Sequence, residues 1–376
     1  MGDFYELFFD DAVVASDVLS IALTKRGKHK GDDIPMCGVP VHAAEGYLLT
    51  LIRKGFRVAV CEQLEDPAEA KKRGSKAVVK RGVTRLVTPG TLTEDSLLNA
   101  RSNNFLASYA EVRGDAALAW TDISTGEIWT MPLTRLRLGP ELARLSPREV
   151  LLSESAEKDL AGIVTESGAS VTPLSRGSFD STSGERRLLA LWNVASLDAF
   201  GSFDRAEIGA LGALADYIDI TQRGKLPLLR PPVRESPGGV MAIDAATRRN
   251  LEITRALDGS RTGALLACVD QTVTAGGGRL LERRLSSPSR DLATIRTRHD
   301  AVAAFVADRA LRDDLRAALR KAPDLDRAMS RLALDRGGPR DLAAIRDGLM
   351  QAGTLAARLT GEQPALVRDA ARDLSG

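Results

Sequence analysis

The chain opens on an aromatic ring and a carboxylate that could act together on one partner. The sequence begins MGDFYELFFDD, with Phe4 and Glu6 two residues apart. In an extended strand over 4–6, both side chains point to one side and Tyr5 points to the other. An apolar ring forced between DNA base steps unstacks them and kinks the duplex, and Met1 would lie near enough to touch the same groove. On this short motif alone, a core phenylalanine and a solvated glutamate are favoured.

The energetic cost of such a wedge depends on the DNA that it enters. A mismatched or unpaired base has already lost part of its stacking energy, so a wedge at Phe4 would select deformable sites rather than a base sequence. Glu6 would repel the phosphate backbone unless it accepts a hydrogen bond from the ring N–H of a displaced base. Alternatively, its carboxyl group takes a proton, which nearby phosphates and burial favour, and donates to a purine N7. A well-paired duplex offers neither, so Glu6 would disfavour matched DNA.

Basic residues follow in two places where they could contact phosphates. Lys25 and Arg26 open the stretch KRGKHK, which we expect to be a loop after an apolar helix. Residues 71–85 contain basic residues and no acid, and Arg85 ends this run. Contacts of this kind position a duplex without reading its sequence. The alternative for each of these residues is a solvated basic loop.

Asp122, in the stretch TDISTGE, allows a different chemistry. In nucleases of the ribonuclease H type an aspartate on the first strand binds a catalytic metal, and such catalysis needs several carboxylates around two ions. Asp216 and Asp219, on a later expected helix, are the tempting partners, but no specific spacing joins the three. An Asp122 that caps a turn or faces solvent is therefore favoured over a metal ligand.

The composition is that of a soluble protein with folded cores. The chain has 376 residues, 44% of them hydrophobic and 27% charged, which suggests about two or three domains. Its net charge is only +2, so any affinity for nucleic acid must come from local patches. Three cysteines without a C-x-x-C pair indicate reduced thiols. The sequence shows neither a signal peptide nor an apolar run long enough for a bilayer, so we expect a cytoplasmic protein and no membrane contact.

The elements that would position these residues begin with a mixed segment, 1–88. Apolar spacing predicts helices at 7–23 and 42–55. An alternating stretch at 56–64 predicts a strand, and the turn VTPGT at 87–91 marks a boundary.

The next segment, 89–236, also mixes strands and helices, which indicates an α/β domain. Residues 116–133 read as a β-hairpin, 147–155 as a loop and a strand, and 211–227 as a helix followed by a loop. A Pro- and Gly-rich stretch, 228–240, ends the segment.

The last segment, 237–376, repeats apolar residues at steps of three and four and is predicted to be helical. Asp244 or Thr247 is placed to cap its first helix. The glycine run at 276–278 lacks the lysine and the strand–turn–helix order of a phosphate-binding loop, so we expect a flexible turn there. The fold class predicted for the chain is thus α/β plus all-α.

Several long blocks, in order along the chain, resemble the bacterial MutS mismatch-repair family. They are GDFYELFFDDA, LTKRG at 23–27, DDIPMCGVPVHAAEGYL at 32–48, VCEQLEDP at 60–67, TRLVTPGT at 84–91, TDISTGE, IDAATRRNLEIT at 243–254, DQTVTAGGGRLLERRLSSP at 270–288 and RLALDRGGPRDLA at 331–343. The resemblance implies a mixed α/β mismatch-binding domain at 1–88, a ribonuclease H-like connector at 89–236 and an α-helical lever domain at 237–376. It also implies that Phe4 and Glu6 recognise mismatched or looped DNA.

The same resemblance sets expectations for partners and cofactors. It places Arg26 and Arg85 in the DNA-facing domain, and it implies a homodimer and a MutL-type repair protein as partners. The family is a DNA-dependent ATPase, which implies ATP and magnesium for the full-length protein. No G-x-x-x-x-G-K-[ST] motif occurs here, since Gly27-Lys28 precedes His29 and Gly224-Lys225 precedes Leu226. We therefore expect an N-terminal part without its own cofactor or catalytic site, in which the clamp and ATPase domains are missing. The alternatives are a nuclease that uses Asp122 and a non-catalytic partner-binding module in which Phe4 is core.

Overall fold

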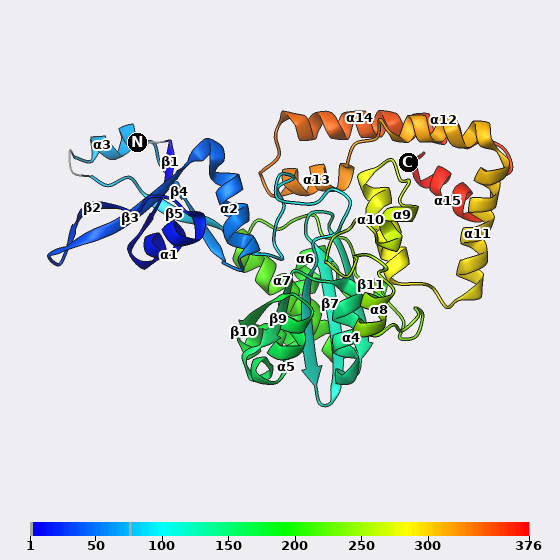
Figure 1. Ribbon diagram of the computed structural model, residues 1–376, viewed down its shortest axis with the longest axis horizontal. Coiled ribbons are helices and arrows are strands. Elements are labelled where there is room, and N and C mark those ends of the chain that lie inside the picture. Colours follow the sequence, from blue (N-terminus) through cyan, green and yellow to red (C-terminus); the bar gives the residue numbers. More distant parts are fainter. Residues whose placement is uncertain (1–2, 75–76, 376) are drawn as a thin grey trace.

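The computed structural model describes residues 3–74 and 77–375, and it has three parts that follow one another along the chain (Figure 1). Two small sheets form the first part, a larger sheet flanked by helices forms the second, and helices form the third. The predicted combination of mixed α/β structure with an all-helical part is confirmed. Within the described ranges, no helix is both long and apolar enough to cross a membrane.

The first part contains a three-stranded antiparallel sheet in the order β1-β3-β2. Its elements are β1 Phe4–Phe8, α1 Phe9–Leu19, β2 Thr24–His29 and β3 Asp32–Pro40. Helix α1 packs against β3, where Ala12, Ala15 and Cys37 form a small buried cluster. The central strand β3 therefore holds both outer strands in register.

A second, two-stranded sheet completes the first part. Its strands β4 Val58–Gln63 and β5 Arg81–Val87 are antiparallel, and the remaining elements are η1 Val41–Ala43, α2 Ala44–Arg53 and α3 Pro67–Lys72. Buried Ile52 and Val87 join α2 to this sheet. Both cores of the first part are small, and pairing between strands holds the backbone that carries its surface side chains.

Two expectations for this part were wrong. The helix predicted at 7–23 begins only at Phe9, because Leu7 and Phe8 pair with β3 as the end of β1. The basic stretch at 25–30, expected to be a loop, forms most of β2. Its lack of apolar residues concealed a strand that is exposed along its whole length.

The second part is built on a six-stranded sheet in the order β10-β9-β6-β7-β8-β11. Its strands are β6 Leu106–Val112, β7 Asp115–Asp122, β8 Glu127–Leu133, β9 Glu149–Ser153, β10 Ser170–Leu174 and β11 Val233–Arg234. Its helices are η2 Arg135–Arg137, α4 Leu138–Leu145, α5 Glu154–Glu166, η3 Arg176–Phe179, α6 Ser181–Trp192, η4 Leu197–Ala199 and α7 Arg205–Gln222. The predicted hairpin at 116–133 is confirmed as β7 and β8, which are antiparallel.

Two buried clusters, one rich in residues of α7 and the other including residues of α4 and α5, account for the stability of this sheet. Strand β7 contributes to both, because its side chains alternate between the two faces. Helix α7 begins at a capping box made by Asp204 and Glu207, which satisfies free backbone groups at its start.

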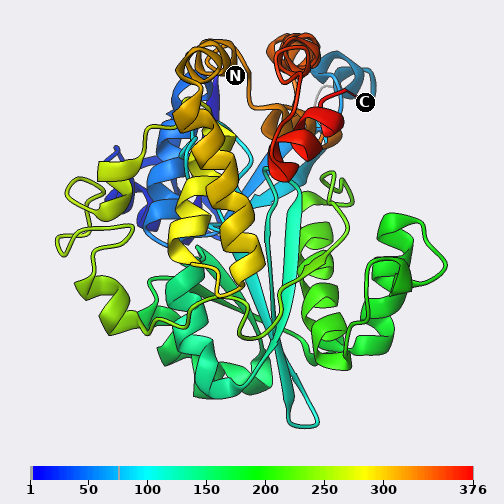
Figure 2. The ribbon, with the colours of Figure 1, turned by 90° about the vertical axis from the view of Figure 1, so that its right-hand side faces the viewer.

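The third part is a set of helices with a loop-rich beginning. Its elements are α8 Ala245–Asn250, α9 Leu265–Val269, α10 Ala275–Ser286, α11 Leu292–Ala307, α12 Arg309–Leu319, α13 Leu325–Ala333, α14 Pro339–Ala356 and α15 Ala365–Asp373. Asp244 caps α8 as predicted, because its carboxylate accepts a hydrogen bond from the Thr247 backbone N–H. Helix α11 contacts α12 and α15, and Figure 2 shows α15 as the red helix.

The glycine run at 276–278 is helical, which corrects the expectation of a flexible turn. It forms the first turns of α10, and the Thr274 hydroxyl accepts a hydrogen bond from the Gly277 N–H. A β-carbon built at Gly278 would lie 3.1 Å from the β-carbon of Arg101. Glycine therefore allows α10 to approach the linker that precedes the large sheet.

That linker, residues 93–102, lies between the first part and the large sheet, and arginines of the third part hold it. The guanidinium of Arg327 donates to the carbonyls of Asn99, at 3.0 Å, and Ser102, at 3.1 Å. Arg279 donates to the Ala100 carbonyl at 2.9 Å. We call the linker together with these arginines the linker seam.

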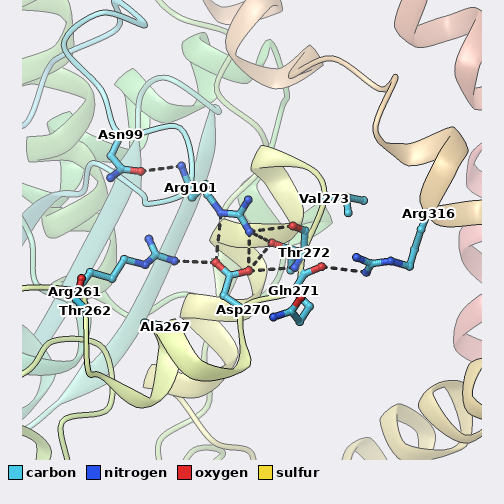
Figure 3. Close-up of a pocket in the computed structure, with 10 residues that line it drawn as sticks. All are labelled: Asn99, Arg101, Arg261, Thr262, Ala267, Asp270, Gln271, Thr272, Val273 and Arg316. Atoms are coloured by element: carbon cyan, nitrogen blue, oxygen red, sulfur yellow. Dashed lines mark hydrogen bonds and ion pairs between the residues drawn. The ribbon is translucent and has the colours of Figure 1, made fainter. Parts of the chain in front are cut away.

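A pocket beside the linker seam shows the same chemistry (Figure 3). The guanidinium groups of Arg101, from the linker, and Arg261 both point at the carboxylate of Asp270, at 2.6 and 2.9 Å. Burial opposes ionisation, but hydrogen bonds from Thr272 and Arg101 more than offset it and lower the pKa of Asp270 to about 2. The pocket is therefore lined by a charge network that is already paired.

Candidate nucleic-acid interface

The structure brings Phe4 and Glu6 to the same face of β1, at the edge of the first sheet. Residues 4–6 are extended, which is the condition under which Phe4 and Glu6 share a face, and exposure alternates along the strand. Phe4 is 58% exposed, so the alternative of a core phenylalanine is wrong. An aromatic ring this exposed at the edge of a sheet is available to a partner.

Tyr5 points to the opposite face and ties β1 to the second sheet. Its hydroxyl donates to the Glu62 carboxylate at 2.5 Å, and Glu62 lies on β4. This hydrogen bond, together with burial and the negative charge of Glu62, raises the pKa of Tyr5 to about 12. The contact fixes the strand from behind while Phe4 and Glu6 face outward.

Gly38 lies directly opposite Glu6 on β3 and leaves room for both side chains. The two residues are paired in the antiparallel register. A β-carbon at Gly38 would lie 3.2 Å from the Tyr5 carbonyl oxygen and 3.6 Å from Cδ1 of Phe4. The glycine in the stretch MCGVP thus relieves a close approach to the backbone of β1 at Tyr5.

Arg26 is the basic residue that joins this site. Its Nη1 lies 2.5 Å from Oε1 of Glu6. Both side chains are partly exposed, at 43% for Arg26 and 35% for Glu6. We call Phe4 and Glu6 on β1, with Arg26 on β2, the probe edge.

The other predicted basic residues lie in different surroundings. Lys25 is 73% exposed and pairs with Asp33 at 2.8 Å, so its ammonium group remains accessible to solvent. The side chain of Arg85, only 21% exposed, pairs with Glu94, and burial lowers its pKa from the ordinary value. A phosphate contact by Arg85 would have to compete with that pair. Met1 lies outside the described residues.

Comparisons with known proteins match each part of the chain to one domain of the same family. The model of MutS domain I matches residues 1–96, that of MutS domain II residues 104–230 and that of MutS domain III residues 246–374. The chain belongs to the MutS family. The three domains match in the same order along the chain as the sequence blocks that resemble this family.

Curated relatives agree with the MutS assignment over the whole chain. Proteins named DNA mismatch repair protein MutS from Cereibacter sphaeroides and Ruegeria pomeroyi are each 65% identical to it, and the one from Paracoccus denitrificans is 64% identical. These matches cover 100% of this chain but 43% of each relative. The chain therefore spans less than half the length of these MutS relatives.

Asp122, the residue of the nuclease alternative, is a buried structural carboxylate in this MutS chain. One oxygen accepts hydrogen bonds from the backbone and hydroxyl of Ser124, and the other from the Asn104 backbone and the Asn103 amide. The predicted turn cap is confirmed, but the side chain does not face solvent. Asp216 pairs with Arg187. Across 3–74 and 77–375, no cluster of three or more His, Cys, Asp or Glu side chains is arranged to hold a metal.

Sequence reasoning found Phe4, Glu6 and Arg26 but missed how they are held. The Tyr5–Glu62 bond joins residues far apart in sequence, and no local pattern signals it. Gly27 was a signal that could have been used, because a glycine inside a strand often marks a bulge. Gly38 was a second signal, since a strand glycine also marks a close approach.

Proposed function

We propose that this chain recognises mismatched or looped duplex DNA through the probe edge. Phe4 would insert at a weakly stacked base step and kink the duplex, and Glu6 would bond the displaced base. Lys25, Arg26, Arg85 and Met1 would contact the DNA backbone. The observation that carries the proposal is the exposed Phe4 ring next to Glu6 on a strand anchored from behind by Tyr5.

The domain division supports this assignment of roles. We propose a mismatch-binding domain at 1–88, a connector at 89–236 and a helical lever domain at 237–376. The two small sheets, the six-stranded sheet and the helical part fall within these ranges. The linker seam then joins the mismatch-binding domain to both of the others.

Further roles belong to the full-length protein and are proposed from the family. They are ATP binding and hydrolysis with magnesium, dimerisation, contact with a MutL-type partner and a cytoplasmic location. For the described residues we propose DNA binding without chemistry. The names of the relatives, DNA mismatch repair protein MutS, support the same role in repair.

The test is a comparison of Phe4→Ala with the unmodified full-length product of the gene. Affinity would be measured for a duplex with one T·G mismatch and for the matched duplex, at one stated salt concentration. We expect Phe4→Ala to abolish the preference for the mismatch and to leave salt-sensitive non-specific binding. The matched control is Phe9→Ala, which removes another exposed ring, 50% exposed, from the same part of the chain. A preference that survives Phe4→Ala would show that the proposal is wrong.

A further inference from the structure

The ion pair between Arg26 and Glu6 joins two strands that are not neighbours. Arg26 lies on β2 and Glu6 on β1, and β3 separates them in the sheet order β1-β3-β2. Nevertheless Nη1 of Arg26 reaches Oε1 of Glu6 at 2.5 Å. The guanidinium therefore crosses the face of the central strand to reach Glu6.

The backbone at Arg26 is irregular in a way that redirects the side chain. Strand β2 shifts register against β3 between Lys25 and Lys28, and Gly27 has a φ of +74°. A bulge with a glycine in the left-handed region re-aims the neighbouring side chain. The two adjacent cations have different partners: Lys25 pairs with Asp33 and Arg26 pairs with Glu6.

We propose that Arg26 is a positioning residue for mismatch discrimination, because it holds the Glu6 carboxylate beside Phe4. One oxygen of Glu6 accepts from Arg26, and the other, which has no hydrogen-bond donor among the residues that the structure describes, can accept from a displaced base. This inference rests on the proposed function. It differs from a phosphate contact, which binds matched and mismatched duplexes alike.

The positioning role predicts a change in a ratio rather than in affinity alone. In Arg26→Gln the Glu6 side chain loses its anchor, so mismatch binding should weaken more than matched binding. We expect the ratio of the two affinities to fall about fivefold, within the range of measured coupling between residues in contact. Arg26→Lys keeps the charge and one N–H donor, so it should restore most of the ratio.

A double-mutant cycle with Glu6→Gln separates the two roles of Arg26. When Glu6 is already changed, Arg26→Gln should lower both affinities by the same factor and leave the ratio as it is. Lys28→Gln is the matched control, because it removes an equal charge from the same exposed strand and should leave the ratio unchanged. Far-ultraviolet circular dichroism and thermal melting check that each variant folds.

Two outcomes would overturn the inference. One is an unchanged ratio in Arg26→Gln, and the other is an equal fall of the ratio with and without Glu6. Phe4→Ala, measured in the same assay, keeps the tests distinguishable. If Phe4→Ala removes the preference and Arg26→Gln does not change it, the positioning role alone fails. If the preference survives Phe4→Ala, the proposed function fails.

Discussion

Arginines pair with carboxylates both at the probe edge and in the linker seam, where Arg279 and Arg327 share Asp324, but only the arginines of the seam are buried. At the probe edge, the side chains of Arg26 and Glu6 are 43% and 35% exposed. In the linker seam, those of Arg279 and Arg327 are 6% and 2% exposed. Exposed pairs contribute about 0–1 kcal/mol and exchange partners easily, whereas a buried pair that loses one partner is strongly destabilised.

This difference indicates a division of labour within one chain. At the probe edge the exposed pair contributes little to stability, so its role lies in placing Glu6. The linker seam holds the segment through which the first part is attached. Arginines of α10 and α13 donate directly to linker carbonyls.

The largest effect on stability is expected at Glu149, a charged residue that is buried even more completely than the arginines of the linker seam. This fully buried carboxylate accepts hydrogen bonds from Thr88, the Gly90 N–H, Thr172 and Tyr217. Glu149→Ala would leave these donors unpaired and create a cavity, at a cost of about 3–5 kcal/mol in the free energy of unfolding. Urea denaturation measures that cost. The control is Glu185→Ala, at an exposed glutamate. It should change the free energy of unfolding by less than about 0.5 kcal/mol.

An intermediate effect, dependent on pH, is expected at Asp270. Its pKa is lowered to about 2, so the folded state favours the ionised carboxylate. The resulting stability is present above the unfolded pKa, near 4, and is lost as pH falls through about 2. Asp270→Asn should cost about 1–2 kcal/mol at pH 7 and flatten the fall in stability between about pH 4 and 2. An acid titration of unfolding that is identical in both proteins would contradict this account.

The smallest stability change is expected behind the probe edge, in Tyr5→Phe. This change removes only the hydroxyl that donates to Glu62, at a cost of about 0.5–1.5 kcal/mol. The bond anchors β1 behind Phe4. The loss in the free energy that separates mismatched from matched binding should therefore exceed the loss in the free energy of unfolding. Tyr109→Phe is a matched control, since it removes a hydroxyl bonded to Glu111 in the large sheet. Equal binding by both variants would show that the anchor is unnecessary.

Much of this architecture could be predicted from local sequence. The extended strand at Phe4, the hairpin around Asp122 and the cap at Asp244 each follow from side-chain spacing or from turn chemistry within a few residues. The strand at Lys25 was missed because a fully exposed edge strand has no apolar alternation to reveal it. The glycines of α10 were misread because the reason for them is close packing against Arg101.

The candidate site divides in the same way. The residue types at Phe4 and Glu6 pointed to a wedge and an acceptor, and their common face follows from the strand period. Arg26 was predicted only as a phosphate contact, whereas the structure pairs it with Glu6. That pair depends on a bulge and on the order of strands in the sheet, neither of which local spacing encodes.

The central claim, that Phe4 enters the base stack at a mismatch, can be tested by one fluorescence measurement. A 2-aminopurine placed next to a T·G mismatch becomes brighter when it is unstacked. Both proteins are compared at concentrations that saturate the duplex. We expect a rise in fluorescence with the unmodified full-length protein and no rise with Phe4→Ala. An equal rise with Phe4→Ala would contradict the account, because the unstacking would then occur without the ring.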